Sequence, residues 1–273
     1  MANGNDDKSG IPPILRGKHY DAPSVFTPEN LLREARRQKR APVTAIPDVC
    51  ILDPDGDMVR HLLAIGRARR EPAWACYHTD LYAFDHEGPR YGIVGCAVGA
   101  AFAVLVAEEL FASGCKLLIS ITSAGQIVAV RTPPYFVIID RALRDEGTSY
   151  HYLPASDYSL ADRALVGLAE ESLAAGGVGA QVGATWTTDA PFRETDMAIR
   201  RARDSGILAV EMEAAALYAF ASARGRPVLC LAHVTNQMAR IEGDFEKGAA
   251  DGAEASLKVI SLVARRWRGH SRP

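Results

Sequence analysis

Short apolar runs alternate with amphipathic segments from residue 49 to residue 268, and this alternation is what most constrains the fold. The apolar runs have the length of buried strands, whereas the segments between them repeat apolar residues with the period of a helix. Strands that alternate with helices form a mainly parallel sheet with helices on both faces. The sequence therefore predicts an α/β fold: a single three-layer α/β/α domain with a mixed, mainly parallel central sheet.

The expected elements follow one another without an internal repeat or a dividing linker. Strands are expected at 49–52, 74–77, 81–84, 91–98, 116–121, 135–140, 179–184 and 227–234, and helices at 58–65, 100–113, 161–175, 194–205 and 252–268. A strand that passes into a helix is expected at 208–223. A further helix begins after Thr27, which suits an N-cap, with Pro28 in its first turn. Residues 25–273 are expected to form one domain, preceded by a flexible N-terminal arm at 1–24 that lacks periodicity.

Charge and hydropathy narrow the range of partners. The 31 basic and 33 acidic residues nearly cancel, so we expect no nucleic acid and no anionic membrane as partner, and a small molecule as substrate. The N-terminus is polar and acidic, and no apolar run reaches the roughly 18 residues that a membrane span needs. A soluble, cytoplasmic protein is therefore expected.

Several kinds of reactive centre find no support in the sequence. The five cysteines lack CxxC and CxxH spacing, and we expect them to be reduced core residues. The glycines at 92, 95 and 99 do not form a dinucleotide motif, and there is neither a zinc-ligand cluster nor a GxSxG elbow. Neither a cofactor nor a metal is expected.

One segment combines two acids with a small-residue helix. Glu211 and Glu213 flank Met212 where a strand is expected to pass into a helix. Acids two residues apart on an extended segment share one face, although a helix can equally hold such a pair toward solvent. Ligands of open α/β sheets bind beyond the carboxyl ends of the strands, and the informative strand ends are 53–57, 96–100, 122–126, 185–193 and 233–237. Spacing alone leaves a functional and a structural role open.

The stretch 209–220 resembles the Val-Glu-Met-Glu-Ala signature of the nucleoside phosphorylase superfamily, in its uridine phosphorylase and hexameric purine nucleoside phosphorylase branch. The likeness runs from about residue 49 to 268, through the glycine-punctuated strand end at 94–100, the Ile-Thr-Ser-Ala-Gly turn at 121–125, and segments 144–152 and 185–195. The resemblance implies that residues 25–273 are a catalytic domain that cleaves the N-glycosidic bond of a nucleoside. It also implies a homo-oligomer, whose sites are completed across subunit contacts.

The resemblance assigns the sugar site to the two-acid segment. Met212 packs beneath the ribose, Glu213 accepts hydrogen bonds from its hydroxyls, and Glu211 is the weaker member of the site. A carboxylate that accepts a hydroxyl in a dry pocket contributes roughly 1.5 to 3 kcal/mol. A nearby anion also favours the oxocarbenium-like sugar that forms as the bond to the base stretches. Glu213 is therefore the first catalytic candidate.

The base site follows from the same resemblance. Phe192 stands where the family stacks a ring on the base, with Trp186 as second candidate, although an aromatic residue at a strand end can equally be core. Arg193 and Glu194 offer a donor and an acceptor to a base edge.

Two further residues are catalytic candidates in the same comparison. His151, in a polar loop, is expected to contact sugar or base. Asn236 stands where purine-cleaving relatives carry an Asp that protonates the leaving base. An amide cannot act as that acid, which favours a pyrimidine nucleoside such as uridine.

The acceptor site departs from the family pattern. Relatives bind phosphate with a hydroxyl, which survives as Ser123, and with arginines, whereas Asp55 and Asp57 occupy the loop that carries the first of these arginines. A dianion that is buried without paired cations loses several kcal/mol per charge. Either a displaced arginine such as Arg60 or one from another subunit serves instead, or the acceptor differs, or water is the nucleophile.

Three functions therefore remain open. The first is transfer of the ribosyl group to inorganic phosphate, and the second is hydrolysis. The turn at 123–125 matches that of methylthioadenosine/S-adenosylhomocysteine nucleosidases, whose first-loop acid aligns here with Met58. The third is a non-catalytic nucleoside-binding protein. The arm, with His19 and Tyr20, is expected to reach into a neighbouring site, as a histidine near the N-terminus does in uridine phosphorylases.

Overall fold

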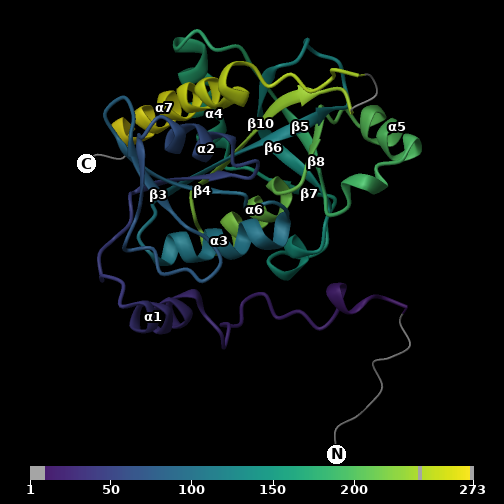
Figure 1. The fold of residues 1–273 in the computed structure, drawn as a ribbon. Coiled ribbons are helices and arrows are strands. Elements are labelled where there is room, and N and C mark those ends of the chain that lie inside the picture. The colour runs from purple at the N-terminus through teal and green to yellow at the C-terminus, as the bar shows by residue number, and fades with distance from the viewer. Residues whose placement is uncertain (1–9, 239–241, 271–273) are drawn as a thin grey trace, which may run out of the picture.

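The computed structural model describes residues 10–238 and 242–270, and Figure 1 labels their elements. The strands are β1 Val49–Asp53, β2 Ala68–Arg70, β3 Tyr82–Asp85, β4 Arg90–Gly95, β5 Leu117–Gln126, β6 Tyr135–Asp145, β7 Tyr158–Leu160, β8 Ala180–Thr188, β9 Ala209–Glu211 and β10 Val228–Asn236. The α-helices are α1 Pro28–Lys39, α2 Asp57–Ala64, α3 Ala100–Ala112, α4 Arg163–Ala175, α5 Asp196–Asp204, α6 Ala214–Arg224 and α7 Ala253–His270. Short 3₁₀ helices are η1 Pro13–Leu15, η2 Thr148–His151, η3 Pro191–Arg193 and η4 Ala249–Gly252.

These strands form one ten-stranded sheet with the order β10-β6-β8-β9-β5-β1-β4-β3-β2, and β7 pairs with β6. The central strands β4, β1, β5 and β10 run parallel to one another, whereas β2, β3 and β7 pair antiparallel at the periphery. Because β10 also pairs with β5, the strands β5, β10, β6, β8 and β9 close on themselves. The predicted α/β fold with a mixed sheet is confirmed.

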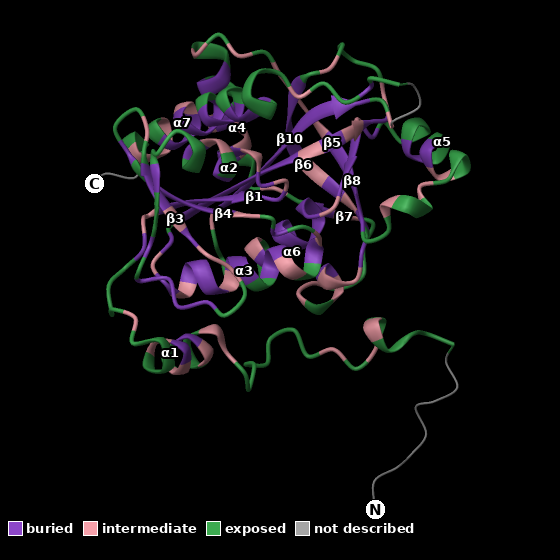
Figure 2. Cartoon of the chain, in the orientation of Figure 1, coloured by how far each residue is buried: buried purple, intermediate pink, exposed green. Residues whose placement is uncertain are grey.

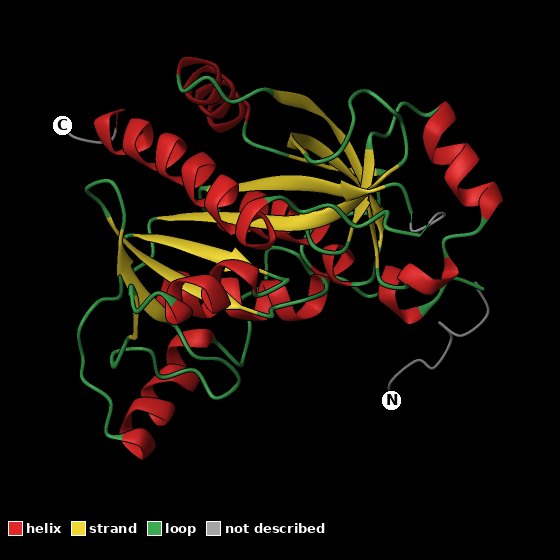
Figure 3. Cartoon of the chain, turned by 45° about the horizontal axis from the view of Figure 1, so that its top comes forward, coloured by secondary structure: helices red, strands yellow, loops and turns green. Residues whose placement is uncertain are grey.

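Helices cover the sheet on both faces, which gives the three predicted layers (Figures 2 and 3). Apolar residues of α3 and α6 form a core with one face of the sheet, and those of α2, α4 and α7 form a core with the other. Residues 214–220 of α6 are all buried, because alanines let this helix lie close to both the sheet and α3. Helix α1 packs on the outside of α3.

The structure corrects some of the expected elements. Residues 74–77 are loop rather than strand; Trp74 is buried, and its indole N–H donates to the carbonyl oxygen and the hydroxyl of Thr79. The apolar residues of segment 74–77 therefore pack in the core without pairing with a neighbouring strand. Strands β2 and β7 were not expected, since they are too short to show alternation. Strand β9 and helix α6 are the strand and helix that were expected to follow each other at 208–223. Strands β5 and β6 continue well beyond their expected ends.

The expectations for the cysteines, for membrane-spanning helices and for the N-terminal arm can also be compared with the structure. Cys50, Cys76, Cys115 and Cys230 are buried, whereas Cys96 is exposed at the end of β4. No helix in the described ranges is long and apolar enough to cross a membrane. Residues 1–9 of the expected arm lie outside the described residues. The rest of the arm runs along the surface, where η1 contacts η2.

Candidate functional site

The register of four strands brings their ends to one place. Val210 of β9 pairs with Gly125 of β5 on one side and with Trp186 of β8 on the other. Gly125 also pairs with Asn236 at the end of β10. Glu211, the last residue of β9, and Glu213, which follows it, therefore lie beside the ends of β5, β8 and β10, as expected for a ligand site of an α/β protein.

Glu211 is fully engaged inside the protein. Its carboxylate accepts hydrogen bonds from the Thr185 hydroxyl at 3.0 Å, the Thr187 hydroxyl at 2.5 Å, and the backbone N–H groups of Glu213 and Ala214 at 2.7 Å each. Burial raises the pKa of Glu211, and these donors oppose that effect. Two of the donors lie at the start of α6, so Glu211 fixes the turn between β9 and this helix and has little capacity left for a ligand.

Glu213 is equally buried, at 1% exposure, but has acceptor capacity to spare. Its Oε1 accepts a hydrogen bond of 2.8 Å from the backbone N–H of Gly99, which precedes α3. Its Oε2 has no hydrogen-bond partner among the described residues. Burial, followed by the charge of Glu211, raises the pKa of Glu213 to about 8. Beside partly buried Met212, this oxygen can accept a hydrogen bond from a ligand hydroxyl.

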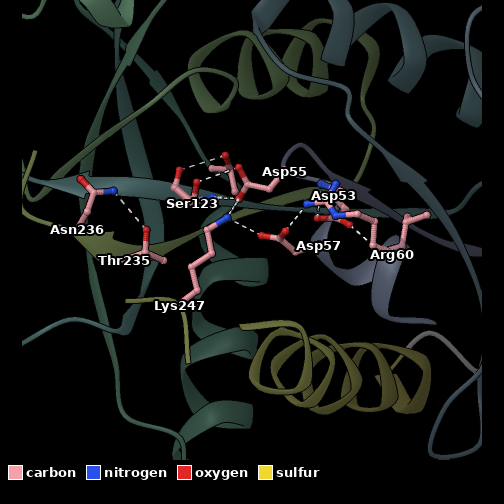
Figure 4. Close-up of polar contacts among 11 residues, drawn as sticks. Asp53, Asp55, Asp57, Arg60, Ser123, Thr235, Asn236 and Lys247 are labelled. Atoms are coloured by element: carbon pink, nitrogen blue, oxygen red, sulfur yellow. Dashed lines mark hydrogen bonds and ion pairs between the residues drawn. The ribbon is translucent and has the colours of Figure 1, made fainter. Parts of the chain in front are cut away.

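Asp55 and Ser123 are joined by two hydrogen bonds (Figure 4). The backbone N–H of Ser123 donates to Asp55 Oδ2 at 3.0 Å, and its hydroxyl donates to Oδ1 at 2.9 Å. The charge of Asp55 also contributes to the raised pKa of Glu213. The structure thus brings together the predicted residues Asp55 and Ser123.

Lys247 is the cation nearest to this pair in Figure 4. Its Nζ lies 2.5 Å from Asp57 Oδ2 and 3.8 Å from Asp55 Oδ2. Burial lowers the pKa of Lys247, but the hydrogen bond to Asp57 and the charge of Asp55 outweigh it, so that the pKa is raised. The ammonium group therefore stays charged at neutral pH. It lies on the loop between β10 and η4, where the sequence showed no recognisable motif.

Arg60, which the sequence offered as a displaced cation, pairs with Asp57 and has a side chain that is 61% exposed. Gly56 makes room for it: its φ is +75°, and a Cβ there would lie 2.8 Å from Arg60 Nη1 and 2.7 Å from Cys96 Sγ. Asp53 supports the same loop by accepting from the N–H groups of Gly56 and Val59, and burial raises its pKa to about 7. Among the described residues, no group of three or more His, Cys, Asp or Glu side chains could hold a metal.

Asn236 and His233 lie on β10 and are both buried. The Asn236 amide donates to the Thr235 hydroxyl at 3.3 Å, and its oxygen accepts from the N–H of Met238 at 2.9 Å. His233 stacks on Phe136 with ring centroids 4.5 Å apart. Burial, followed by the nearby Lys247, lowers the pKa of His233 to about 4, so this histidine is neutral at physiological pH.

The predicted base-binding residues are not gathered around Glu213 in the single chain. Trp186 is buried in a small core with Ile127 and Ile199, and its indole N–H donates to Asp145 at 3.0 Å. Phe192 on η3 is 99% exposed, and Arg193 beside it is exposed as well. Glu194 is half-buried, and burial raises its pKa to about 7.

His151 lies apart from the Asp55 cluster, on η2. Its Nδ1 lies 2.8 Å from Lys18 Nζ of the N-terminal arm. Burial, followed by Lys18, lowers the pKa of His151. The loop that carries His151 is held by Arg144, whose guanidinium donates to Ser149, Leu153, Pro154 and Ser156 and lies 4.3 Å from the ring centroid of Tyr150.

Some residues of the candidate site had no signal in the sequence. Lys247 lies in an irregular loop, and Gly99 contributes a backbone N–H that no residue pattern can announce. Thr185 and Thr187 are two residues apart on a strand, so the sequence predicts that they share a face. It does not predict that both hydroxyls donate to Glu211.

A family model described as the phosphorylase superfamily matches residues 48–265. The chain belongs to the phosphorylase superfamily. This superfamily member is 28% identical over 189 residues to a guanosine phosphorylase from Halorubrum lacusprofundi, with 67% of this chain and 75% of that protein covered. It is 30% identical over 163 residues to a DeoD-type purine nucleoside phosphorylase from Bacillus cereus, which covers 56% of this chain and 66% of that protein.

Solved structures agree on the fold of this superfamily member. The uridine phosphorylase of Vibrio fischeri superposes with a TM-score of 0.66 at 21% sequence identity, over 82% of this chain and 93% of that one. The family resemblance read from the sequence motifs is confirmed, and the fold is that of the nucleoside phosphorylases.

Proposed function

We propose that this chain is an enzyme that cleaves the N-glycosidic bond of a nucleoside and transfers the ribosyl group to inorganic phosphate. One observation carries the proposal: among the described residues Oε2 of the buried Glu213 has no partner, and Asp55, which accepts two hydrogen bonds from Ser123, adds its charge to those that raise the pKa of Glu213. The names of the similar proteins, which are nucleoside phosphorylases, support the same activity.

Glu213 serves the sugar in this proposal. Its free Oε2 accepts a ribose hydroxyl, a contact worth roughly 1.5 to 3 kcal/mol when the acceptor is ionised. Positive charge develops on the sugar as the bond to the base stretches, and this charge favours the ionised form of Glu213 over the neutral form that burial favours. The interaction therefore strengthens toward the transition state, which is the requirement for catalysis.

The base is proposed to be a pyrimidine such as uracil. Asn236 stands at the end of β10, and an amide is not acidic enough to transfer a proton to a leaving purine. The base itself is proposed to lie near Trp186, Phe192, Arg193 and Glu194, and His151 to contact the ligand. These assignments require the segment from η3 to α5 to close over the site, since Phe192 is exposed in the free chain.

Hydrolysis is a second candidate, and one contact favours it. Asp55 holds the backbone N–H and hydroxyl of Ser123, so a carboxylate is already present where the acceptor is expected. A carboxylate in that place can accept a proton from an attacking water molecule. In this candidate mechanism Asp55 is the acid, whereas the sequence comparison aligned the first-loop acid of the nucleosidases with Met58.

We also propose that the chain works as a homo-oligomer. Val25 and Phe26, just before α1, are 99% and 71% exposed, and a neighbouring subunit would remove these apolar side chains from water.

The direct test is release of free base from uridine, 2′-deoxyuridine, guanosine and inosine, followed by chromatography. The proposal expects the highest kcat/KM with a pyrimidine nucleoside and loss of release in the Glu213→Gln variant. Preference for guanosine would overturn the pyrimidine assignment while leaving the cleavage reaction in place.

A further inference from the structure

The donors expected to bind an acceptor oxyanion are already occupied by the chain itself. Ser123 offers two donors of different kinds, a backbone N–H and a hydroxyl, and both point to one carboxylate group, that of Asp55. Two donors that converge on a pair of carboxylate oxygens bind a phosphate oxygen pair equally well, because both groups are anions with similar O–O spacing. In the free protein, Asp55 therefore stands in for the acceptor anion.

Within the part of the chain that the structure describes, the cation nearest to Asp55 is committed to the same loop. Lys247 Nζ lies 2.5 Å from Asp57 Oδ2 and 3.8 Å from Asp55 Oδ2, with its side chain 26% exposed. Arg60 pairs with the other oxygen of Asp57. The positive charges of this cluster are thus balanced internally by carboxylates, and none is left over for a dianion.

Space leads to the same conclusion as charge. The cavity among Asp55, Ser123, His233 and Lys247 has a volume of about 20 Å³, which is room for one water molecule and not for a phosphate ion. An acceptor larger than water enters only if the Asp55 carboxylate leaves Ser123. Asp55 lies in the turn between the buried β1 and α2, and the next residue, Gly56, has a left-handed conformation. A rotation of the Asp55 side chain can therefore move its carboxylate away from Ser123.

We propose that Asp55 is an internal competitor of the acceptor phosphate: its carboxylate holds Ser123 in the empty enzyme and must leave before phosphate can take Ser123 and Lys247. This inference rests on the proposed transfer to phosphate and names the residue that limits affinity for it. Asp55 then sets acceptor specificity, because an anion binds only when it interacts with Ser123 and Lys247 more strongly than Asp55 does.

Inorganic phosphate itself is the probe for the test. Thermal unfolding of the wild type, Asp55→Asn and Asp55→Ala is followed in rising phosphate, against chloride at equal ionic strength. Removal of the competing charge is expected to lower the apparent Kd for phosphate by about tenfold or more. Lys247→Met is expected to raise it. Asp80→Asn, which removes an exposed aspartate paired with Arg70, is the matched control and should leave the Kd unchanged.

Steady-state kinetics supply the second readout. Asp55→Asn is expected to lower the KM for phosphate, and Asp80→Asn is expected to leave it unchanged. An unchanged phosphate Kd in both Asp55 variants would overturn the inference, as would loss of base release with no gain in phosphate binding, which would make Asp55 a proton acceptor for water. Because phosphate binding is measured without a nucleoside, the inference can fail or hold whether or not the wild type cleaves one.

Discussion

Glu211 accepts a hydrogen bond of 2.7 Å from the backbone N–H of Glu213, and its charge helps to raise the pKa of Glu213. Two acids that look alike in the sequence therefore have different tasks. The carboxylate of Glu211 accepts hydrogen bonds from four protein donors and stabilises the turn into α6. Glu213 keeps one oxygen free of partners within the described part of the chain.

This difference predicts that Glu213→Gln impairs catalysis rather than folding. The amide keeps the size of the side chain but carries no negative charge to stabilise an oxocarbenium-like sugar, so kcat/KM for the nucleoside should fall by about 100-fold or more. Steady-state base release measures the effect, and circular dichroism confirms the fold. Activity within about twofold of the wild type would show that Glu213 does not serve the sugar.

Glu211→Ala should impair folding instead. It leaves the hydroxyls of Thr185 and Thr187 and two backbone N–H groups without their acceptor, and each unsatisfied buried donor costs about 1 to 3 kcal/mol. Urea denaturation should show a free energy of unfolding lowered by about 3 kcal/mol or more, with partial recovery in Glu211→Gln. A loss below about 1 kcal/mol would mean that water replaces the carboxylate.

The lowered pKa of His233 predicts that the free energy of unfolding falls in acid. Its folded pKa of about 4 lies below its ordinary value of 6.5, so between these values the unfolded chain binds a proton that the folded protein does not. The contribution is complete above pH 6.5 and is lost as the pH falls toward 4, by up to about 3 kcal/mol. Lys247, Asp55 and Asp57 are the charged groups that act on the His233 ring.

The measurement compares urea denaturation of the wild type and His233→Phe between pH 7 and pH 4. Both proteins lose stability as their carboxylates become protonated, but the wild type should lose more, because only it must protonate His233. Parallel curves for the two proteins would contradict a buried neutral histidine.

Gly56→Ala tests the turn that holds Asp55. A residue with a Cβ at φ +75° is strained by about 1 to 2 kcal/mol, and here the Cβ would also press on Cys96 and Arg60. We expect a fall in the free energy of unfolding of that order, together with a change in the KM for the acceptor. Gly66→Ala is the control, since its φ is +68° but nothing lies within 4 Å of its Cβ. Equal losses in both variants, with the acceptor KM unchanged, would show that contacts with Cys96 and Arg60 do not matter.

The N-terminal arm is predicted to support the loop of His151. Lys18 lies 2.8 Å from His151, and the Tyr20 hydroxyl donates to the carbonyl oxygen of Tyr150 at 3.4 Å. Removal of residues 1–24 should lower kcat/KM by about tenfold, because the loop loses a support that positions the ligand. Lys18→Met separates this contact from the rest of the arm. Full activity of the truncated protein would refute a role for the arm at any site, including that of a neighbouring subunit.

The sequence predicted the layers and the site edge well, because they depend on hydrophobic period and strand order. Short strands were missed for a physical reason: β2 Ala68–Arg70 and β7 Tyr158–Leu160 are fixed by the strands they pair with rather than by their own pattern. In the same way Asp55 and Ser123 were named as candidates, but their contact depends on the register of β1 and β5. The exposure of Phe192 could not be predicted either, because an aromatic residue after a strand is ordinarily buried.

The most direct test of the account is the fate of the sugar when the purified protein cleaves uridine in phosphate buffer and in phosphate-free buffer. The account predicts that free base appears only with phosphate and that the sugar product is ribose 1-phosphate. Phosphate-independent release of free ribose would contradict the transfer to phosphate and assign Asp55 and Ser123 to water. Absence of base release from every nucleoside tested, in either buffer, would contradict the central claim that this chain cleaves an N-glycosidic bond.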